Sequence, residues 1–105
     1  MASVYSKSFF YDTVTPGSPV AFMTGAATET WILRDILCSV GSGAPSWSVE
    51  VTDTSGNVIF VSPTLATNPY VSQSLRMVLM PATSYTVSTS GTNVFVSISG
   101  YVLSA

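Results

Sequence analysis

The sequence of 105 residues is long enough for one domain with a substantial core, and 47% of its residues are hydrophobic while only 8% are charged. The net charge is −2 and only three residues are Lys or Arg, which excludes a basic surface of the kind that binds nucleic acid. Ser and Thr are abundant, so hydroxyl groups dominate the polar surface. Because charge normally keeps isolated domains soluble, this composition favours a protein that works inside an assembly or outside a cell.

Neither a membrane span nor a targeting signal is expected. No stretch reaches the roughly 18 apolar residues that a transmembrane helix needs. The first residues lack a basic segment followed by a long apolar core, so we expect no signal peptide. The single cysteine, Cys38, forbids an intramolecular disulfide, and its apolar surroundings favour a small buried side chain over a reactive thiol.

In the first half of the chain, short strands precede one apolar-rich central strand. Residues 4–11 predict a strand, 15–19 a turn with Pro and Gly, and 20–23 a short strand. Residues 28–40 follow, and their apolar side chains would occupy both faces of a strand, which is typical of the middle of a sheet. Strict alternation predicts two sets: Trp31, Leu33 and Leu37 on one face, and Ile32, Ile36, Cys38 and Val40 on the other.

Two adjacent charges, Arg34 and Asp35, interrupt this central strand and should point to opposite faces by alternation. Burying either without a partner would be costly. We therefore expect a structural ion pair among Arg34, Asp35 and Arg76, with Asp35 bound to Arg76 or to backbone amides rather than acting as a catalytic acid.

The second half of the chain continues the strand pattern. After a Gly-rich loop at 41–45, residues 47–51 alternate between apolar and polar side chains, which predicts a strand. A hairpin turn at 53–57 then leads into a returning strand at 58–61. Residues 62–70 form the longest connection, and 71–80 the second apolar-rich strand. Residues 85–89 and 94–99 alternate again around a predicted tight hairpin at 90–93, and Gly100 should form a bulge before 101–103.

This pattern predicts an all-β protein. About eight short strands are separated by turn signals, and no segment reads as a convincing helix. The apolar-rich strands lie far apart in the sequence yet must share one core. We therefore expect a single β-sandwich domain over residues 1–105, with Greek-key or jelly-roll connections.

No catalytic group, cofactor site or metal site is predicted. The chain has no histidine, which excludes a Ser-His-Asp triad, a Cys-His pair and a histidine metal ligand. Asp53 and Asn57 suggest calcium ligands, but their loop is short and poor in carboxylates, which favours a turn. We expect no enzyme activity.

Several aromatic residues near strand ends and loops are candidate interface residues. Two main interpretations apply to each. The first is a place in the core or at its rim, and the second is a place in a subunit interface, where aromatic side chains are enriched. A sugar-binding surface is a third. The candidates are Phe9, Phe10, Tyr11, Trp47 and Tyr70.

Several segments resemble small all-β virion proteins of tailed bacteriophages. Residues 20–40 resemble the strand, small-residue turn and strand of that group, with Leu33-Arg34-Asp35-Ile36 as the central motif. Residues 75–81 resemble its strand ending at a proline, and 94–101 its closing strand with a Ser-Gly step. The chain departs from the group at Ala82 and Thr83, where Gly and Asp would be expected.

The resemblance implies a structural virion component, either a capsid decoration (cement) protein or a head or tail accessory protein. Together with the scarcity of charge, it leads us to expect a homo-oligomer, a trimer or a higher ring, bound to a major capsid or tail protein. Such a protein would be assembled into the virion in the host cytoplasm, with neither nucleic acid nor membrane as partner. A tail-associated receptor- or carbohydrate-binding module remains the alternative.

Overall fold

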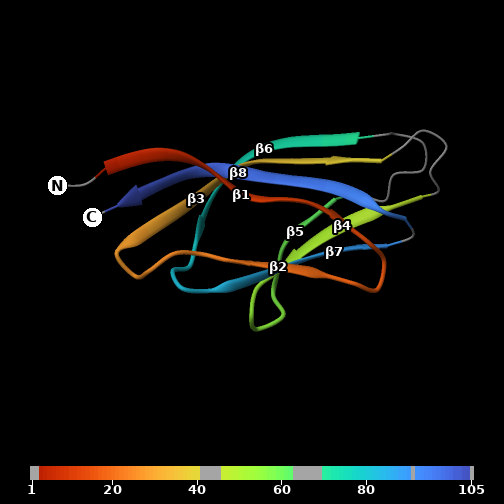
Figure 1. Cartoon of the computed structure of the whole chain (residues 1–105), viewed down its shortest axis with the longest axis horizontal. Coiled ribbons are helices and arrows are strands. Elements are labelled where there is room, and N and C mark those ends of the chain that lie inside the picture. The colour runs from red at the N-terminus through yellow and green to blue at the C-terminus, as the bar shows by residue number, and fades with distance from the viewer. Residues whose placement is uncertain (1–2, 41–45, 63–69, 91, 105) are drawn as a thin grey trace.

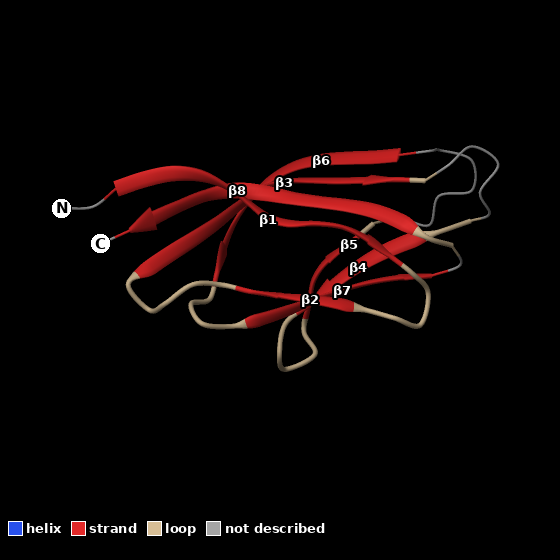
Figure 2. Ribbon diagram, viewed as in Figure 1, coloured by secondary structure: helices blue, strands red, loops and turns tan. Residues whose placement is uncertain are grey.

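The computed structural model describes residues 3–40, 46–62, 70–90 and 92–104, and these form an all-β sandwich of two antiparallel sheets (Figures 1 and 2). The large sheet has the strand order β1-β8-β3-β6, and the small sheet has the order β2-β7-β4-β5. In this order the first strand pairs with the last, which is the arrangement of a jelly roll. The described residues include no helix that could cross a membrane.

The large sheet is built from long strands and the small sheet from short ones. The strands of the large sheet are β1 (Ser3–Val14), β8 (Val94–Ser104), β3 (Glu29–Ser39) and β6 (Tyr70–Leu79). Those of the small sheet are β2 (Val20–Met23), β7 (Ser84–Ser90), β4 (Ser48–Thr52) and β5 (Val58–Val61). The large sheet therefore extends beyond the small one, at the end where β1 begins and β8 ends (Figure 1).

The predicted all-β sandwich is confirmed, and the strands predicted at 20–23 and 58–61 have the observed bounds. The predicted loop at 41–45 and most of the predicted connection at 62–70 lie outside the described residues. The tight hairpin predicted at 90–93 is wrong, because β7 belongs to the small sheet and β8 to the large sheet. Turn residues indicate a change of direction but not whether the chain stays in the same sheet.

The hairpin predicted at 53–57 does form, between β4 and β5. Gly56 adopts a φ of +84°, and the Asp53 carboxylate accepts hydrogen bonds from the backbone amides of Ser55 and Asn57, each at 2.9 Å. These oxygens are occupied by the turn itself, as the turn interpretation of Asp53 requires. Hydrogen bonds from Asn57, its side chain first, hold the pKa of Asp53 below the usual value.

The core lies between the sheets, and the central strand β3 supplies much of it. Leu33 and Ile36 have no exposed surface. Cys38 is also fully buried, and this burial raises the pKa of its thiol to about 12. Because the thiolate is the reactive form, Cys38 is a packing residue.

An extra residue in β3, Arg34, changes the phase of the central strand. In the pairing of β3 with β8, Leu33 lies opposite Gly100 and Asp35 lies opposite Ser99, so Arg34 has no partner of its own in β8. This is the geometry of a β-bulge. Its consequence is that Arg34 and Asp35 lie on the same face of the sheet instead of on opposite faces.

The bulge explains which apolar residues of β3 reach the core. Trp31 and Leu33 before the bulge, and Ile36 after it, all pack in the core cluster. Ile32 and Leu37 lie on the outer face, where Leu37 is exposed. A single extra residue reverses the phase of everything that follows, so the predicted two sets of side chains are corrected here.

Gly100 is not the bulge that the sequence suggested. Alternation along β8 continues through it, since Ile98 and Val102 on either side are both fully buried. A Cβ atom at Gly100 would collide with the backbone carbonyl of Ile32. Glycine is therefore needed here for the close approach of β8 to the bulged strand β3.

Two loops at one end of the sandwich are joined by hydrogen bonds. The buried Thr24 hydroxyl donates to the Met80 carbonyl at 2.6 Å and accepts from the Thr83 amide at 2.9 Å. Between these partners, Ala82 adopts a φ of 48° and its amide donates to the Gly25 carbonyl. A left-handed φ of this kind favours glycine over alanine, so the backbone at Ala82 is strained.

Candidate functional site: the outer face of the large sheet

We define the outer face as the side of the large sheet that points away from the small sheet. Large apolar side chains are strongly exposed on it from three strands, β1, β3 and β6. They are Val4 (65% exposed), Tyr11 (73%), Leu37 (39%), Tyr70 (60%) and Val78 (63%). An apolar surface of this kind is typical of an interaction site.

Hydroxyl groups separate these apolar side chains. The strand registers place Ser8, Ser99, Asp35 and Ser74 in one row across the sheet. Within this row the Ser74 hydroxyl donates to Asp35 Oδ1 at 2.9 Å. The face therefore combines exposed apolar groups with neutral polar groups, a mixture typical of protein interfaces.

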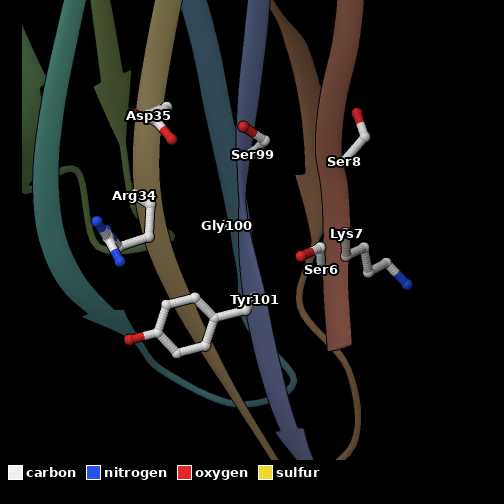
Figure 3. A pocket seen from close by; sticks show the side chains of 8 residues that line it. All are labelled: Ser6, Lys7, Ser8, Arg34, Asp35, Ser99, Gly100 and Tyr101. Atoms are coloured by element: carbon white, nitrogen blue, oxygen red, sulfur yellow. The ribbon is translucent and has the colours of Figure 1, made fainter. Parts of the chain in front are cut away.

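A hollow of about 470 Å³ lies in the middle of the outer face, around Gly100 (Figure 3). Gly100 itself faces the core side together with Ile98 and Val102, so the hollow lies over its backbone, between the outward-facing Ser99 and Tyr101. Its polar walls come from three strands: Ser6, Ser8, Arg34, Asp35, Ser99 and Tyr101. The Tyr101 ring lies across the sheet toward Arg34, whose guanidinium carbon is 5.9 Å from the ring centroid (Figure 3).

A second hollow of about 390 Å³ continues from Arg34 to Arg76 and is also lined by Ser74 and Leu75. We call the two hollows together the Arg34 groove. Both arginines lie on the outer face, yet among the described residues neither forms an ion pair with a carboxylate. The ion pair expected among Arg34, Asp35 and Arg76 is thus absent, because the bulge turns Asp35 toward Ser74.

The structure separates the predicted aromatic interface residues into two groups. Phe9, Phe10 and Trp47 are buried in the core, at 7%, 6% and 1% exposure. The register of β1 shifts between Ser8 and Phe10, so two consecutive phenylalanines both point inward. For these three residues the core interpretation therefore replaces the interface interpretation.

Tyr11 and Tyr70 lie on the outer face and remain candidates for an interface. Tyr11 packs edge-on against Phe95, with 4.9 Å between ring centroids. An aromatic side chain held in this way can contact a partner with little further loss of rotamer freedom.

The sequence did not reveal a side-chain cluster where the large sheet extends beyond the small sheet. The Glu29 carboxylate accepts hydrogen bonds from the Tyr5 hydroxyl and the Trp31 indole, both at 3.1 Å. Lys7 Nζ lies 4.7 Å from the centroid of the Trp31 ring, which also stacks on Phe9. The cluster links β1 to β3. Its only signal in the sequence is apolar alternation in which the two charged residues, Lys7 and Glu29, have the same phase as the neighbouring aromatic residues Phe9 and Trp31.

The arrangement offers binding surfaces rather than reacting groups. Among the described residues, no group of three or more His, Cys, Asp or Glu side chains could hold a metal ion. The groove walls are hydroxyls, two guanidinium groups and one carboxylate that already accepts a hydrogen bond.

No protein-family model and no curated protein matches the sequence. Solved structures share the fold at low identity. The core of Drosophila NLP, described in terms of pentamer formation and histone binding, has a TM-score of 0.58 and 19% identity over 91% of this chain and 98% of that chain. A Bacillus endospore appendage protein that forms disulfide-linked pili has a TM-score of 0.52 and 9% identity over 100% of this chain and 90% of that chain.

A protein of infectious bursal disease virus, Gx strain, has a TM-score of 0.50 and 14% identity. The match covers 98% of this chain but only 33% of the viral chain. At these identities the likenesses show the sandwich fold.

Proposed function

We propose that this chain is a structural subunit that self-associates and binds a larger particle. The observation that carries the proposal is the exposed apolar surface on the outer face of the large sheet. Burial of these side chains against another protein would remove apolar area from water, which favours a protein–protein contact. The small number of charged residues points the same way, since a lone domain depends on charge for solubility.

The solved structures with this fold support the proposal at a coarse level. One forms a pentamer, one forms pili, and one belongs to a virus particle. The resemblance of residues 20–40, 75–81 and 94–101 to virion proteins of tailed bacteriophages supports the finer assignment.

In that finer form, the chain is a capsid decoration (cement) protein or a head or tail accessory protein of a phage virion. It acts as a trimer or a higher ring on a major capsid or tail protein. It has no catalytic activity of its own, and its work is to add contacts between neighbouring proteins.

Sedimentation velocity across a concentration series, combined with mass spectrometry of purified particles, tests this function. We expect species larger than a monomer and the chain itself among the particle proteins. Val78→Asp, which introduces a charge on the outer face, should weaken association while leaving thermal unfolding unchanged. Ser55→Asp, at the exposed tip of the 53–57 turn, introduces the same charge elsewhere and is the matched control. A monomer at every concentration that is also missing from particles would refute the proposal.

A receptor- or carbohydrate-binding function is the second candidate, and the hollow around Gly100 favours it. Hydroxyls, a guanidinium group, a carboxylate and the Tyr101 ring converge there, and such groups bind sugars by hydrogen bonds and ring contacts. A glycan array with the wild-type protein and Tyr101→Ala distinguishes the candidates. Selective binding that Tyr101→Ala removes would favour the sugar site, whereas a purely structural subunit should show no selectivity.

A further inference from the structure

We propose that subunits associate head to tail, with the outer face of the large sheet of one copy packed on the outer face of the small sheet of the next copy. In this contact Glu50 of the small sheet enters the Arg34 groove beside Arg76. The inference rests on the proposed self-association and adds which two surfaces meet. The charged side chains that bear on this contact are few.

The cations are distributed unevenly between the faces. Lys7 lies over the Trp31 ring, on the core side of the large sheet. Arg34 and Arg76 both lie on the outer face of the large sheet and border one hollow. Arg34 contacts an aromatic ring, whereas Arg76 is exposed and makes no hydrogen bond or ion pair with any described residue. The outer face thus presents a guanidinium group without a partner.

The carboxylates are occupied within the chain, with one exception. Glu29 accepts two side-chain hydrogen bonds, and Asp53 is held in its turn. Asp35 accepts a hydrogen bond from a serine, and Asp12 accepts one from the next backbone amide. The Glu50 carboxylate makes no hydrogen bond or ion pair within the part of the chain that the structure describes.

Glu50 lies in the middle of the other outer face. It belongs to β4, an inner strand of the small sheet, and pairs with Ser88 on β7 and Val61 on β5. Its neighbours Val49 and Val51 are fully buried, so alternation points Glu50 away from the core. Val61, beside it on the same face, is 57% exposed. This face therefore also combines exposed apolar surface with one unpartnered charge of the opposite sign.

Only the contact between unlike faces gives each charge a partner. Two large-sheet faces in contact would leave Glu50 without a partner, and two small-sheet faces would leave Arg76 without a partner and bring two Glu50 carboxylates together. Like charges facing each other across an interface are strongly unfavourable. A contact between two different faces of the same molecule is heterologous, and it closes into a ring or continues as a filament.

Charge reversal at these two positions tests the contact. In Arg76→Glu, the new carboxylate on the large-sheet face would repel Glu50 of the next copy. In Glu50→Arg, the new guanidinium group on the small-sheet face would repel Arg76 of the next copy. Each variant alone should associate at least about tenfold more weakly than the wild type in sedimentation velocity. Both side chains point to solvent, so far-UV circular dichroism and thermal unfolding should be unchanged.

The variants should then complement each other. In an equimolar mixture of Arg76→Glu and Glu50→Arg every contact between unlike subunits is favourable, so the mixture should form mixed species that neither variant forms alone. The double variant should also associate by itself. A contact between like faces predicts no such rescue. If a reversal variant fails to fold, Arg76→Gln or Glu50→Gln replaces it, and its association should become weaker and less dependent on salt.

The outcomes separate this inference from the proposed function. A wild-type protein that stays monomeric and is missing from particles refutes self-association itself. A wild-type protein that associates, together with reversal variants that associate equally well, refutes only the head-to-tail contact. Weakened single variants whose double variant does not recover association also overturn the inference.

Discussion

Replacing Gly100 with alanine should destabilise the sandwich, because the added methyl group has no room. Its Cβ would meet the carbonyl oxygen and carbon of Ile32 and the amide nitrogen of Arg34, all of them backbone atoms. Backbone cannot rotate away as a flexible side chain can. The strand that carries Gly100 is also paired on both sides, with β1 and β3, so it cannot move without breaking a ladder.

The expected cost follows from these contacts. Overpacking a dense interior by one methyl group typically costs about 1–3 kcal/mol. The separation of β8 from β3 adds about 1 kcal/mol for each backbone hydrogen bond lost. We therefore expect a loss of at least about 3 kcal/mol, a large share of the roughly 5–15 kcal/mol that stabilises a domain. The melting temperature should fall by more than about 10 °C.

Urea unfolding followed by tryptophan fluorescence measures this loss, since Trp31 and Trp47 are both buried and report on the core. Ser99→Ala is the matched control, because it changes the adjacent residue on the same strand without adding volume. It should change the free energy of unfolding by less than about 0.5 kcal/mol. A loss below about 1 kcal/mol for Gly100→Ala would show that β8 can move away from Ile32 and would refute the reasoning.

Four further results are expected. Leu33→Ala should lower the free energy of unfolding by about 2–5 kcal/mol in the same assay, because Leu33 is fully buried. Asp53→Ala should destabilise at neutral pH, and its difference from the wild type should shrink in urea titrations as the pH falls below the ordinary carboxylate pKa, because the folded-state pKa of Asp53 is lowered. Cys38 should react with a thiol reagent only after denaturant is added, because its pKa is raised to about 12. Ala82→Gly should raise the melting temperature, because Ala82 has a φ of 48°.

Strand positions could be predicted from the sequence because alternation is a local property. The pairs Val49 and Val51 in β4, and Val94 and Val96 in β8, are all fully buried. Such spacing fixes which side chains share a face as long as the strand remains regular. The sequence also predicted that the apolar-rich strands β3 and β6 share one core, but not that they are neighbours in one sheet, as the structure shows.

The candidate site was harder to predict because it depends on irregularities. One extra residue at Arg34 brings Arg34 and Asp35 to one face, and one at Phe9 turns two phenylalanines inward. Bulges arise from the fit between neighbouring strands, and nothing in the local sequence of β1 or β3 marks their position. The sequence marked Gly100 as unusual. Glycine is required there because the backbone of β3, which is distant in the sequence, leaves no room for a side chain.

The pairing of β1 with β8 has a consequence for how the chain folds. The register joins Ser3 to Ser104, so the first strand of this domain pairs with its last strand. Until β8 is available, β1 and β3 lack the strand between them, and the apolar side chains of β3 stay exposed. Folding dominated by such distant contacts is slow, and partly made chains are prone to aggregate. Folding of this domain should therefore depend on rapid synthesis of β8 after β1 and β3, and deletion of β8 should abolish the soluble protein.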